Sequence, residues 1–484
     1  MTGSTARRLQ QFIDNGWRDS ETDGWIDDVN PSDVRDVVAL VPEGSANDAH
    51  AAASAAARAF PAWRALTGPA RAEHLYKWAA AIGDRAEELA QVMAREVGKP
   101  IGEARGEVGR CVVILRYYAG EAVRQIGDVI PAQSPGALQF SLREPLGVVA
   151  MITPWNFPLA IPLWKVAPAL AFGNTVVLKP AESSSYLAAL LAETASAAGI
   201  PAGVFNVLFG SGATVGAAIL AEPEVRAVSF TGSGAVGARV AATAAARNIR
   251  YQTEMGGKNV VIVMPDADIA KAASLTAAGA MRYAGQKCTA TSRVVVARSV
   301  EGEFLRQLRS QVESLPIGPV TDAKAAVGPV ISRASHESIT KALKDANAEA
   351  LFSVPIPGSA EFSNGNFFAP TVVRGGDPDG MLAQRELFGP VLAAFTADDA
   401  DHAIELANRT SYGLSASIFT RDLTTALDYI NRIHVGLVRV NGDTTGVDPH
   451  APFGGMKGSS SGSREQGPAA REFYTEIKTV QVNP

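Results

Sequence analysis

Cysteine is nearly absent from this sequence, which has only Cys111 and Cys288 among 484 residues. Two cysteines cannot form the disulfide framework of a secreted scaffold, so we expect a reducing, cytoplasmic environment. No run of about 18 apolar residues occurs, and residues 1–9 lack the apolar core of a signal peptide. We therefore expect neither a membrane span nor a leader segment.

An excess of positive charge and metal-ligand spacings are also missing. The formal net charge is -5, which argues mildly against a nucleic-acid partner, because phosphate binding needs a clustered basic surface. The six histidines show no H-x-x-x-H spacing and the cysteines no C-x-x-C spacing, so no metal site is predicted.

What the chain does contain is the balance of a globular protein, with 47% apolar and 19% charged residues. Its length predicts two or three domains, because single cores rarely grow beyond roughly 250–300 residues. In the first half, apolar residues recur at helical spacing within 75–82, 86–93 and 108–115. Cys111 lies on the last of these stripes and is interpreted as a packing residue.

From Gly147 onward, short apolar runs alternate with helical stretches, which predicts an α/β fold with a parallel sheet covered on both faces. The predicted strands are 148–152, 175–178, 204–208 and 227–230. Ligands of such sheets bind beyond the carboxyl ends of the strands. Those ends are followed by 153–157, 179–182, 210–214 and 231–237.

Residues 232–237 match G-x-G-x-x-G between a predicted strand and helix, which alone is a weak signal of dinucleotide binding. The acid that usually follows about 20 residues later would be Glu254 by count. Glu254, however, opens Glu-Met-Gly-Gly-Lys before the cysteine segment, so we expect a different acid to hold the ribose.

Cys288, in Tyr-Ala-Gly-Gln-Lys-Cys-Thr, and Glu254 together suggest covalent catalysis. A small thiolate fraction attacks carbonyl carbon readily, and a positioned carboxylate can activate the water that releases the acyl group. That pairing is the chemistry of aldehyde oxidation.

Seven motifs in order resemble the NAD(P)-dependent aldehyde dehydrogenase superfamily over essentially the whole chain. They are Thr153-Pro-Trp-Asn-Phe-Pro158, Lys179-Pro-Ala-Glu182, Ser229-Phe-Thr-Gly-Ser233, Glu254-Met-Gly-Gly-Lys258, Gly285-Gln-Lys-Cys288, Glu386-Leu-Phe-Gly-Pro390 and Pro452-Phe-Gly-Gly-Met-Lys457. The resemblance implies a Rossmann-like cofactor-binding domain, an α/β catalytic domain and a small β oligomerisation arm. The expected divisions are 1–120 with 144–255 for the cofactor, 256–440 for catalysis, 121–143 with 465–484 for the arm, and 441–464 near the active site.

The resemblance makes Cys288 the nucleophile, Glu254 the general base that hydrolyses the thioester, and Asn156 the side-chain donor to the oxyanion of the thiohemiacetal. The alternative for Asn156 is a turn residue near prolines, and for Glu254 a solvated surface charge. Within complete motifs we favour the catalytic interpretation for both residues.

For the cofactor, the resemblance assigns Lys179 and Glu182 to the adenosine ribose, Ser233 to the pyrophosphate, and Glu386 with Phe388 to the nicotinamide ribose. NAD is preferred and NADP possible, because the Glu182 carboxylate would repel a 2′-phosphate. The remaining cofactor residues implied are Ile152, Thr153, Pro154, Trp155, Ala181, Gly212, Phe230, Thr231, Gly232, Val236, Met255 and Gly256.

Arg282 occupies the position at which succinic semialdehyde dehydrogenases hold the far carboxylate of the substrate, although it could also be a helix-end arginine. Their second arginine is replaced here by Trp164. The motifs around Trp164 and Cys288 resemble 2-oxoglutarate semialdehyde (2,5-dioxopentanoate) dehydrogenases, which favours an ω-semialdehyde of a small carboxylic acid. Phe157 and Phe453 complete the expected substrate residues.

Other functions remain open at this point. The substrate could be succinic semialdehyde or a range of neutral aldehydes, whereas a cationic aldehyde would fit poorly beside Arg282. A CoA-acylating dehydrogenase would use the same cysteine but has no need of a hydrolytic carboxylate at Glu254. A non-catalytic nucleotide-binding protein would be expected to lose Cys288 or Asn156.

Two segments, 137–143 and 473–482, have the pattern of strands. The resemblance implies that they pair subunits into a homodimer or homotetramer, and the alternative is an intramolecular edge hairpin. The serine cluster 459–463 is interpreted as structural.

Overall fold

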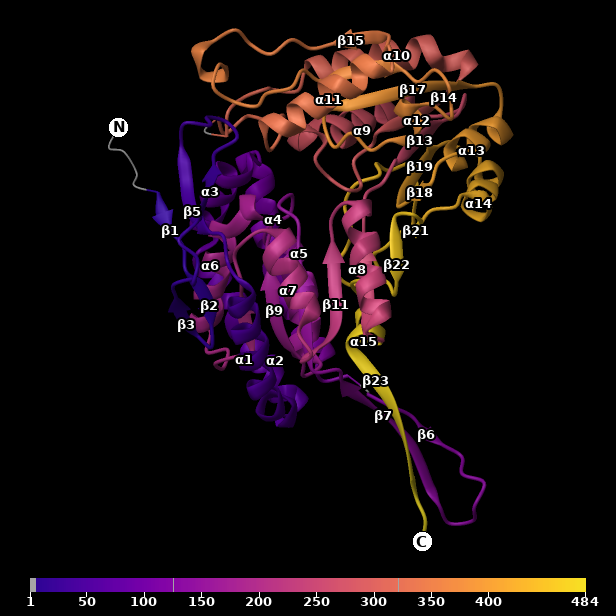
Figure 1. Cartoon of the computed structure of the whole chain (residues 1–484). Coiled ribbons are helices and arrows are strands. Elements are labelled where there is room, and N and C mark those ends of the chain that lie inside the picture. The colour runs from indigo at the N-terminus through magenta and orange to yellow at the C-terminus, as the bar shows by residue number, and fades with distance from the viewer. Residues whose placement is uncertain (1–5, 125, 321) are drawn as a thin grey trace.

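The computed structural model describes residues 6–124, 126–320 and 322–484, and it contains two large sheets flanked by helices (Figure 1). In the first sheet the five central strands are parallel, and strands at both edges run antiparallel. Its order is β22 (Ser460–Gly462), β12 (Arg250–Glu254), β11 (Val225–Thr231), β8 (Val148–Ile152), β9 (Thr175–Lys179), β10 (Phe205–Val207), β2 (Gln11–Ile13) and β3 (Gly16–Arg18). The four strands predicted from apolar runs are confirmed, with shifts of one or two residues at their ends.

Alternating side chains of the central strands enter two separate cores, which explains why these strands are apolar throughout. Val149 and Met151 face one core, and Val148 and Ala150 face the other. The first core is shared with α2 (Gly68–Asp84), α3 (Ala86–Val97), α4 (Ile101–Glu121), α5 (Ala160–Ala171) and α6 (Ser185–Ala197). The second is shared with α1 (Ala46–Ala65), α7 (Ala217–Ala221) and α8 (Gly234–Ala246).

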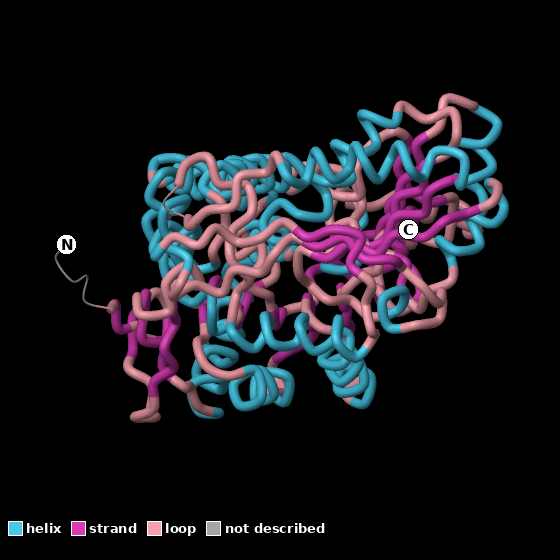
Figure 2. The backbone as a smooth tube through the Cα atoms, turned by 90° about the horizontal axis from the view of Figure 1, so that it is seen from above, coloured by secondary structure: helices cyan, strands magenta, loops and turns pink. Residues whose placement is uncertain are grey.

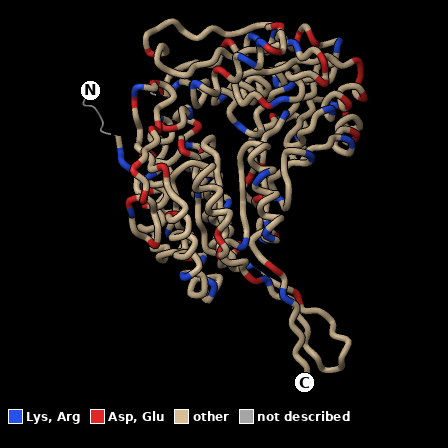
Figure 3. Tube along the Cα trace, viewed as in Figure 1, with Lys and Arg blue, Asp and Glu red and all other residues tan. Residues whose placement is uncertain are grey.

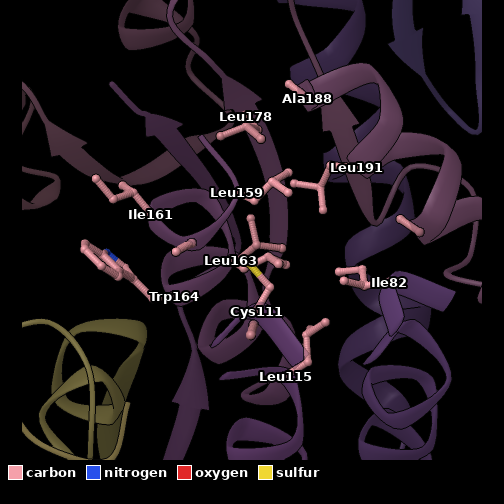
Figure 4. Packing of buried hydrophobic residues seen from close by; sticks show 14 of the residues in the cluster. Ile82, Cys111, Leu115, Leu159, Ile161, Leu163, Trp164, Leu178, Ala188 and Leu191 are labelled. Atoms are coloured by element: carbon pink, nitrogen blue, oxygen red, sulfur yellow. The ribbon is translucent and has the colours of Figure 1, made fainter. Parts of the chain in front are cut away.

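Cys111 is fully buried in the first core, as the apolar stripe predicts. Figure 4 shows its sulfur among side chains from α2, α4 and α5, with Leu115, Leu159 and Leu163 nearby. Burial raises the pKa of this thiol well above its ordinary value, and Cys111 packs as a small apolar side chain within this core.

The second sheet is parallel except for its first strand and has almost wholly buried central strands. Its order is β15 (Ala350–Ser353), β16 (Thr371–Arg374), β17 (Val391–Ala397), β14 (Arg293–Ala297), β13 (Val260–Val263), β19 (Ser415–Phe419) and β20 (Leu437–Val440). The helices of this half are α9 (Ile269–Met281), α10 (Glu301–Glu313), α11 (Arg333–Asp345), α12 (Met381–Gln384), α13 (Ala400–Asn408) and α14 (Leu423–Arg432).

A three-stranded antiparallel arm projects from the body in Figure 1. Figure 2 shows the chain from above, where the C-terminus lies within the outline of the body. The arm consists of β23 (Thr475–Val482), β7 (Leu138–Pro145) and β6 (Val129–Ile130). The predicted strand at 473–482 begins two residues later, because Phe473 and Tyr474 are buried within α15 (Ala469–Tyr474).

Smaller pairings complete the structure, and charge is spread over it. The strands β1 (Arg7–Arg8), β5 (Val37–Pro42) and β4 (Trp25–Val29) form one small sheet, and β18 (Tyr412–Gly413) pairs with β21 (Met456–Lys457). Figure 3 shows lysine and arginine interspersed with aspartate and glutamate along the chain.

Candidate active site

A cavity of about 300 Å³ lies between the two large sheets, beyond the carboxyl ends of β8, β11 and β12. Its walls come from both halves of the chain, as expected for parallel sheets. The lining residues are Pro154, Trp155, Asn156, Ile161, Thr231, Gly232, Ser233, Met255, Gly256, Cys288, Ser335, Glu386 and Phe388. All but Ile161 and Ser335 are residues that the sequence predicts for catalysis or cofactor binding.

Cys288 follows a tight left-handed turn. Tyr283 and Ala284 have φ of 54° and 51°, and a Cβ at Gly285 would lie 2.4 Å from the carbonyl oxygen of Gly389. The buried Gln286 side chain fixes the turn, because its Oε1 accepts the N–H of Ile331 at 2.8 Å. Burial, with the nearby Glu386 and Glu254 carboxylates, raises the pKa of the Cys288 thiol to about 12.

Asn156 brings a buried amide to the same cavity. Its Nδ2 donates to the Gln286 carbonyl oxygen at 3.1 Å, and its own carbonyl accepts from Lys99 Nζ at 2.7 Å. An amide nitrogen carries two hydrogens, so the second donor of Nδ2 remains for a ligand beside Cys288.

Glu254, the last residue of β12, is buried next to this cavity but does not line it. Ser460 Oγ donates to its Oε2 at 2.5 Å, whereas Oε1 has no hydrogen-bond partner among the described residues. A Cβ at Gly454 would lie 2.8 Å from that oxygen, so a glycine leaves room for the carboxylate. Burial and the Glu465 carboxylate raise the pKa of Glu254 well above its usual range, and the bond from Ser460 opposes this.

Glu465 occupies the centre of a buried polar cluster behind Glu254. Lys165 Nζ donates to one carboxylate oxygen and Trp164 Nε1 to the other, the latter at 2.7 Å. Ser229 Oγ also donates to Glu465, at 3.2 Å. The indole N–H of Trp164 is therefore already used inside the protein.

The four predicted substrate residues do not line the Cys288 cavity. Trp164 and Phe453 pack together with ring centroids 5.4 Å apart, and Lys99 Nζ lies 4.1 Å from the Phe157 ring centroid. Arg282 is exposed at the end of α9, where its backbone N–H donates to the Ala278 carbonyl, and its side chain makes no hydrogen bond or ion pair within the described part of the chain.

The predicted ribose residues form a second polar group at the end of β9. Lys179 Nζ donates to Glu182 Oε1 at 3.3 Å, and the backbone N–H of Gly212 donates to the same oxygen at 3.0 Å. Ile152 also borders this group, because a Cβ at Gly216 would contact both Ile152 and Lys179 at 3.8 Å. Ala181 precedes the 3-10 turn Glu182–Ser184.

The start of α8 lies between these two groups and resembles an anion site. Ser233, the N-cap of α8, makes no side-chain capping bond, and Thr231 Oγ1 is buried without a partner within the described residues. The glycines of this motif have packing roles. A Cβ at Gly232 would lie 2.6 Å from the Phe230 ring, and one at Gly237 2.6 Å from Met255 Sδ.

Glu386 and Phe388 form the wall opposite Asn156. Glu386 Oε1 accepts the N–H of Gly257 at 3.1 Å, and burial raises the pKa of this carboxyl group to about 7. Phe388 has φ of 54°, and its ring stands perpendicular to that of Trp155 with centroids 5.6 Å apart. A bulky residue held at positive φ is strained, so the surrounding contacts must hold Phe388 in this conformation.

Sequence reasoning missed three residues of the site. Ile161 and Ser335 line the cavity from α5 and α11, where no motif distinguishes them. Ser460 belongs to the serine cluster interpreted as structural, and only the pairing of β22 with β12 brings it to Glu254. The register Glu254↔Ser460 could not be read from the sequence alone.

Two features are absent from the described residues, which exclude 1–5, 125 and 321: a metal-binding group of side chains and a membrane-spanning helix. These residues contain no group of three or more histidine, cysteine, aspartate or glutamate side chains placed to hold a metal ion. Within the same residues, no helix is long and apolar enough to cross a membrane.

Comparison with known proteins gives one consistent result. The chain matches the aldehyde dehydrogenase family over residues 17–480. It is 44% identical to an alpha-ketoglutaric semialdehyde dehydrogenase of Bacillus subtilis (strain 168), covering 98% of both chains. It is 37% identical to a succinate-semialdehyde dehydrogenase (NADP(+)) of Escherichia coli (strain K12), covering 100% of this chain and 99% of that one.

The fold agrees with the sequence comparison. The crystal structure of an NAD-dependent aldehyde dehydrogenase from Sinorhizobium meliloti is 39% identical and superposes with a TM-score of 0.94, covering 98% of this chain and 95% of that chain. The family match spans nearly the whole sequence, and it includes every element that lines the Cys288 cavity. The chain therefore belongs to the aldehyde dehydrogenase family.

Proposed function

We propose that this protein oxidises an ω-semialdehyde of a small carboxylic acid, such as 2-oxoglutarate semialdehyde, with NAD or NADP and without coenzyme A. The observation that carries the proposal is a single cavity in which Cys288, Asn156 and Glu386 meet the start of α8, with Glu254 buried beside it. These are the groups needed for thioester chemistry and for holding a dinucleotide.

Catalysis begins with loss of the Cys288 proton, because the thiolate is the nucleophile. The raised pKa of the thiol means that this proton must leave for water as the sulfur attacks, so that Glu254 keeps its carboxylate for the later hydrolysis. The sulfur then bonds to the aldehyde carbon, and negative charge develops on the former carbonyl oxygen.

Asn156 stabilises that oxygen with the Nδ2 hydrogen that Gln286 does not use. A donor aimed at charge that appears only in the transition state is worth about 2.7–4 kcal/mol. When bound, the dinucleotide would supply the oxidising chemistry by accepting hydride from the same carbon. The Cys288 thiohemiacetal thereby becomes a thioester.

Glu254 then removes a proton from the water that attacks the thioester carbon. The C–S bond breaks, the carboxylic acid is released and Cys288 regains its proton. A general base is most effective when its pKa lies near the working pH, and burial shifts the pKa of Glu254 in that direction. A carboxylate in this position also argues against transfer of the acyl group to coenzyme A.

For the cofactor, we propose that Lys179 and Glu182 hold the adenosine ribose, the start of α8 holds the pyrophosphate, and Glu386 holds the nicotinamide ribose. Unpaired N–H groups and the helix dipole attract phosphate to a helix N-terminus. We propose a preference for NAD, because the Glu182 carboxylate already accepts the Gly212 N–H and would lie close to a 2′-phosphate. At about 4 Å, two unit charges repel by about 4 kcal/mol at an effective dielectric of 20, before screening.

For the substrate, the alpha-ketoglutaric semialdehyde dehydrogenase at 44% identity supports an acidic aldehyde. Trp164, Phe157 and Phe453 keep their proposed part in shaping the approach, whereas Arg282 is exposed and lines no part of the Cys288 cavity. The E. coli relative makes succinic semialdehyde the second candidate.

We also propose that the arm joins subunits into a dimer or tetramer, and that the first sheet and its helices form the cofactor domain. The arm leaves apolar side chains in solvent, with Val129 78% and Ile477 63% exposed. Such side chains on a projecting sheet favour contact with a second copy.

The test is oxidation of a matched panel of acidic, neutral and cationic aldehydes, with NAD or NADP and without coenzyme A. The proposal requires the highest kcat/KM for an acidic semialdehyde and release of the free acid. Equal kcat/KM for neutral aldehydes, or a strict need for coenzyme A, would contradict it.

A further inference from the structure

A second cavity, of about 520 Å³, is lined by an arginine that no motif identified. Its walls are one face of α4, with Gly106, Arg110 and Val113, together with Arg439 of β20 and the segment 445–449. The spacing of the α4 residues places them on one side of the helix.

Hydrogen bonds connect both walls of this cavity to the segments that carry Asn156 and Cys288. On the α4 side, Glu107 Oε1 accepts the N–H groups of Leu159 and Ala160 at 3.0 and 2.9 Å, in the segment that follows Asn156. On the other side, Thr444 Oγ1 donates to the carbonyl oxygen of Thr289 at 2.7 Å, next to Cys288. One wall of the cavity is therefore bonded to the segment that carries Asn156, and the other wall to the segment that carries Cys288.

The same segment continues along the site beyond the cavity. The ring of His450 lies 6.5 Å from that of Tyr117, one turn beyond Val113 on α4, and Phe453 packs on Trp164. Gly454 then adjoins the Glu254 carboxylate. Figure 4 shows the Trp164 ring set apart from the side chains around Cys111.

Arg110 is an unsatisfied cation in the wall. Its Nε is buried without a hydrogen-bond partner, and its guanidinium makes no ion pair of 4.0 Å or less within the described residues. The only acid lining the cavity there is Asp448, while Arg439 adds a second positive charge. Burial lowers the pKa of Arg110, and the Asp448 and Glu107 carboxylates oppose that shift.

A guanidinium with idle donors in an open cavity is best satisfied by a carboxylate, which accepts two parallel hydrogen bonds. Arg282, by comparison, is exposed and lines neither cavity. The indole of Trp164 replaces the second substrate arginine of succinic semialdehyde dehydrogenases and is bonded to Glu465.

We propose that Arg110 anchors the distal carboxylate of the substrate, so that an acidic aldehyde extends from Cys288 into the second cavity. This proposal rests on the proposed oxidation of an acidic semialdehyde. The second cavity would bind the acid end of the substrate, and Arg110 would make the enzyme prefer acidic aldehydes to neutral ones.

The test compares Arg110→Met and Arg110→Lys with Arg116→Met, an exposed arginine further along the same helix. Steady-state kinetics are measured with 2-oxoglutarate semialdehyde and with butanal, and glutarate is used as an inhibitor. Arg110→Met should raise KM for the acidic aldehyde by about 10- to 100-fold with little change in kcat, as expected for loss of a charged hydrogen bond.

The same variant should weaken inhibition by glutarate and leave KM for butanal unchanged, which also shows that it is folded. Arg110→Lys should recover part of the affinity, and Arg116→Met should behave as the parent. An unchanged KM for the acid, or an equal rise for both aldehydes, overturns the Arg110 assignment while leaving the proposed function intact. If the parent protein itself does not prefer acidic aldehydes and glutarate does not inhibit it, the proposed substrate fails and the anchor fails with it.

Discussion

The Glu254 carboxyl group beside the Cys288 cavity is buried, whereas the Glu182 carboxylate at the other end of the site reaches solvent. Glu254 is 1% exposed, and the Glu182 side chain is 38% exposed. Burial shifts the pKa of Cys288, Glu254 and Glu386 upward, because each would carry its charge away from water. Solvent weakens any charge effect of Glu182.

This difference in burial predicts that catalysis and cofactor preference respond differently to substitution. Bond making at Cys288 depends on charges that water does not screen, so single substitutions there should have large effects. Discrimination between NAD and NADP depends on one half-exposed carboxylate, so it should be modest. The predictions below follow that order.

The largest effect is expected for Glu254→Gln. Loss of the general base should slow steady turnover by about 10²- to 10⁴-fold and leave one rapid burst of NAD(P)H per active site. Stopped-flow absorbance would measure both phases. Steady turnover at the parent rate would show that another group activates the water. The buried Glu254 carboxylate would then contribute less to the rate than proposed.

Asn156→Ala should lower kcat by about 10²- to 10³-fold, because the oxyanion loses a donor worth about 2.7–4 kcal/mol. The burst phase should slow together with steady turnover, unlike in Glu254→Gln. Asn156→Asp provides a matched control of nearly equal size that removes the Nδ2 donor. A normal burst rate in both variants would remove Asn156 from the mechanism.

Ser460→Ala should have an intermediate effect that depends on pH. The bond from Ser460 lowers the pKa of Glu254, so its loss raises that pKa and reduces the base form on the acid side of the pH–rate profile. The acid limb of kcat should move to higher pH, with a loss of roughly tenfold at low pH, as expected for a bond to a charged group.

Ser461→Ala is the matched control for this prediction, since Ser461 pairs with Thr253 through its backbone and makes no side-chain bond within the described residues. Its pH profile should coincide with that of the parent. A parent-like profile for Ser460→Ala would show that the hydrogen bond from Ser460 does not lower the pKa of Glu254.

The smallest effect is expected for Glu182→Ala, at the exposed end. Removing the carboxylate should improve kcat/KM for NADP relative to NAD by about fivefold, equivalent to about 1 kcal/mol after solvent screening. A change of several hundredfold would mean that Glu182 is desolvated when the cofactor binds. Both ends of the site would then be shielded from water during catalysis.

Much of the site could be predicted from the sequence because its motifs end strands of a parallel sheet. Buried strands such as Val148–Ile152 are continuous apolar runs, and the polar residues that follow must gather at one edge. Cys111 was also predictable, since helical spacing placed it on a buried stripe.

The remaining features depend on contacts between distant segments. Glu254 and Ser460 are 206 residues apart and meet only because β22 pairs with β12. The Trp164 indole is directed to Glu465, 301 residues away, which no local pattern signals. Arg110 has the helical spacing of an ordinary surface arginine, and only the segment 445–449 turns its surroundings into a cavity.

The central claim is that Cys288 carries the acyl group. Glu254→Gln protein mixed with NAD and an acidic semialdehyde, quenched in acid and digested, can be analysed by mass spectrometry. We expect one acyl adduct on Cys288 for each NADH released, with Cys111 unmodified. Formation of NADH without an adduct on Cys288, or parent-like turnover by Cys288→Ala, would contradict the account.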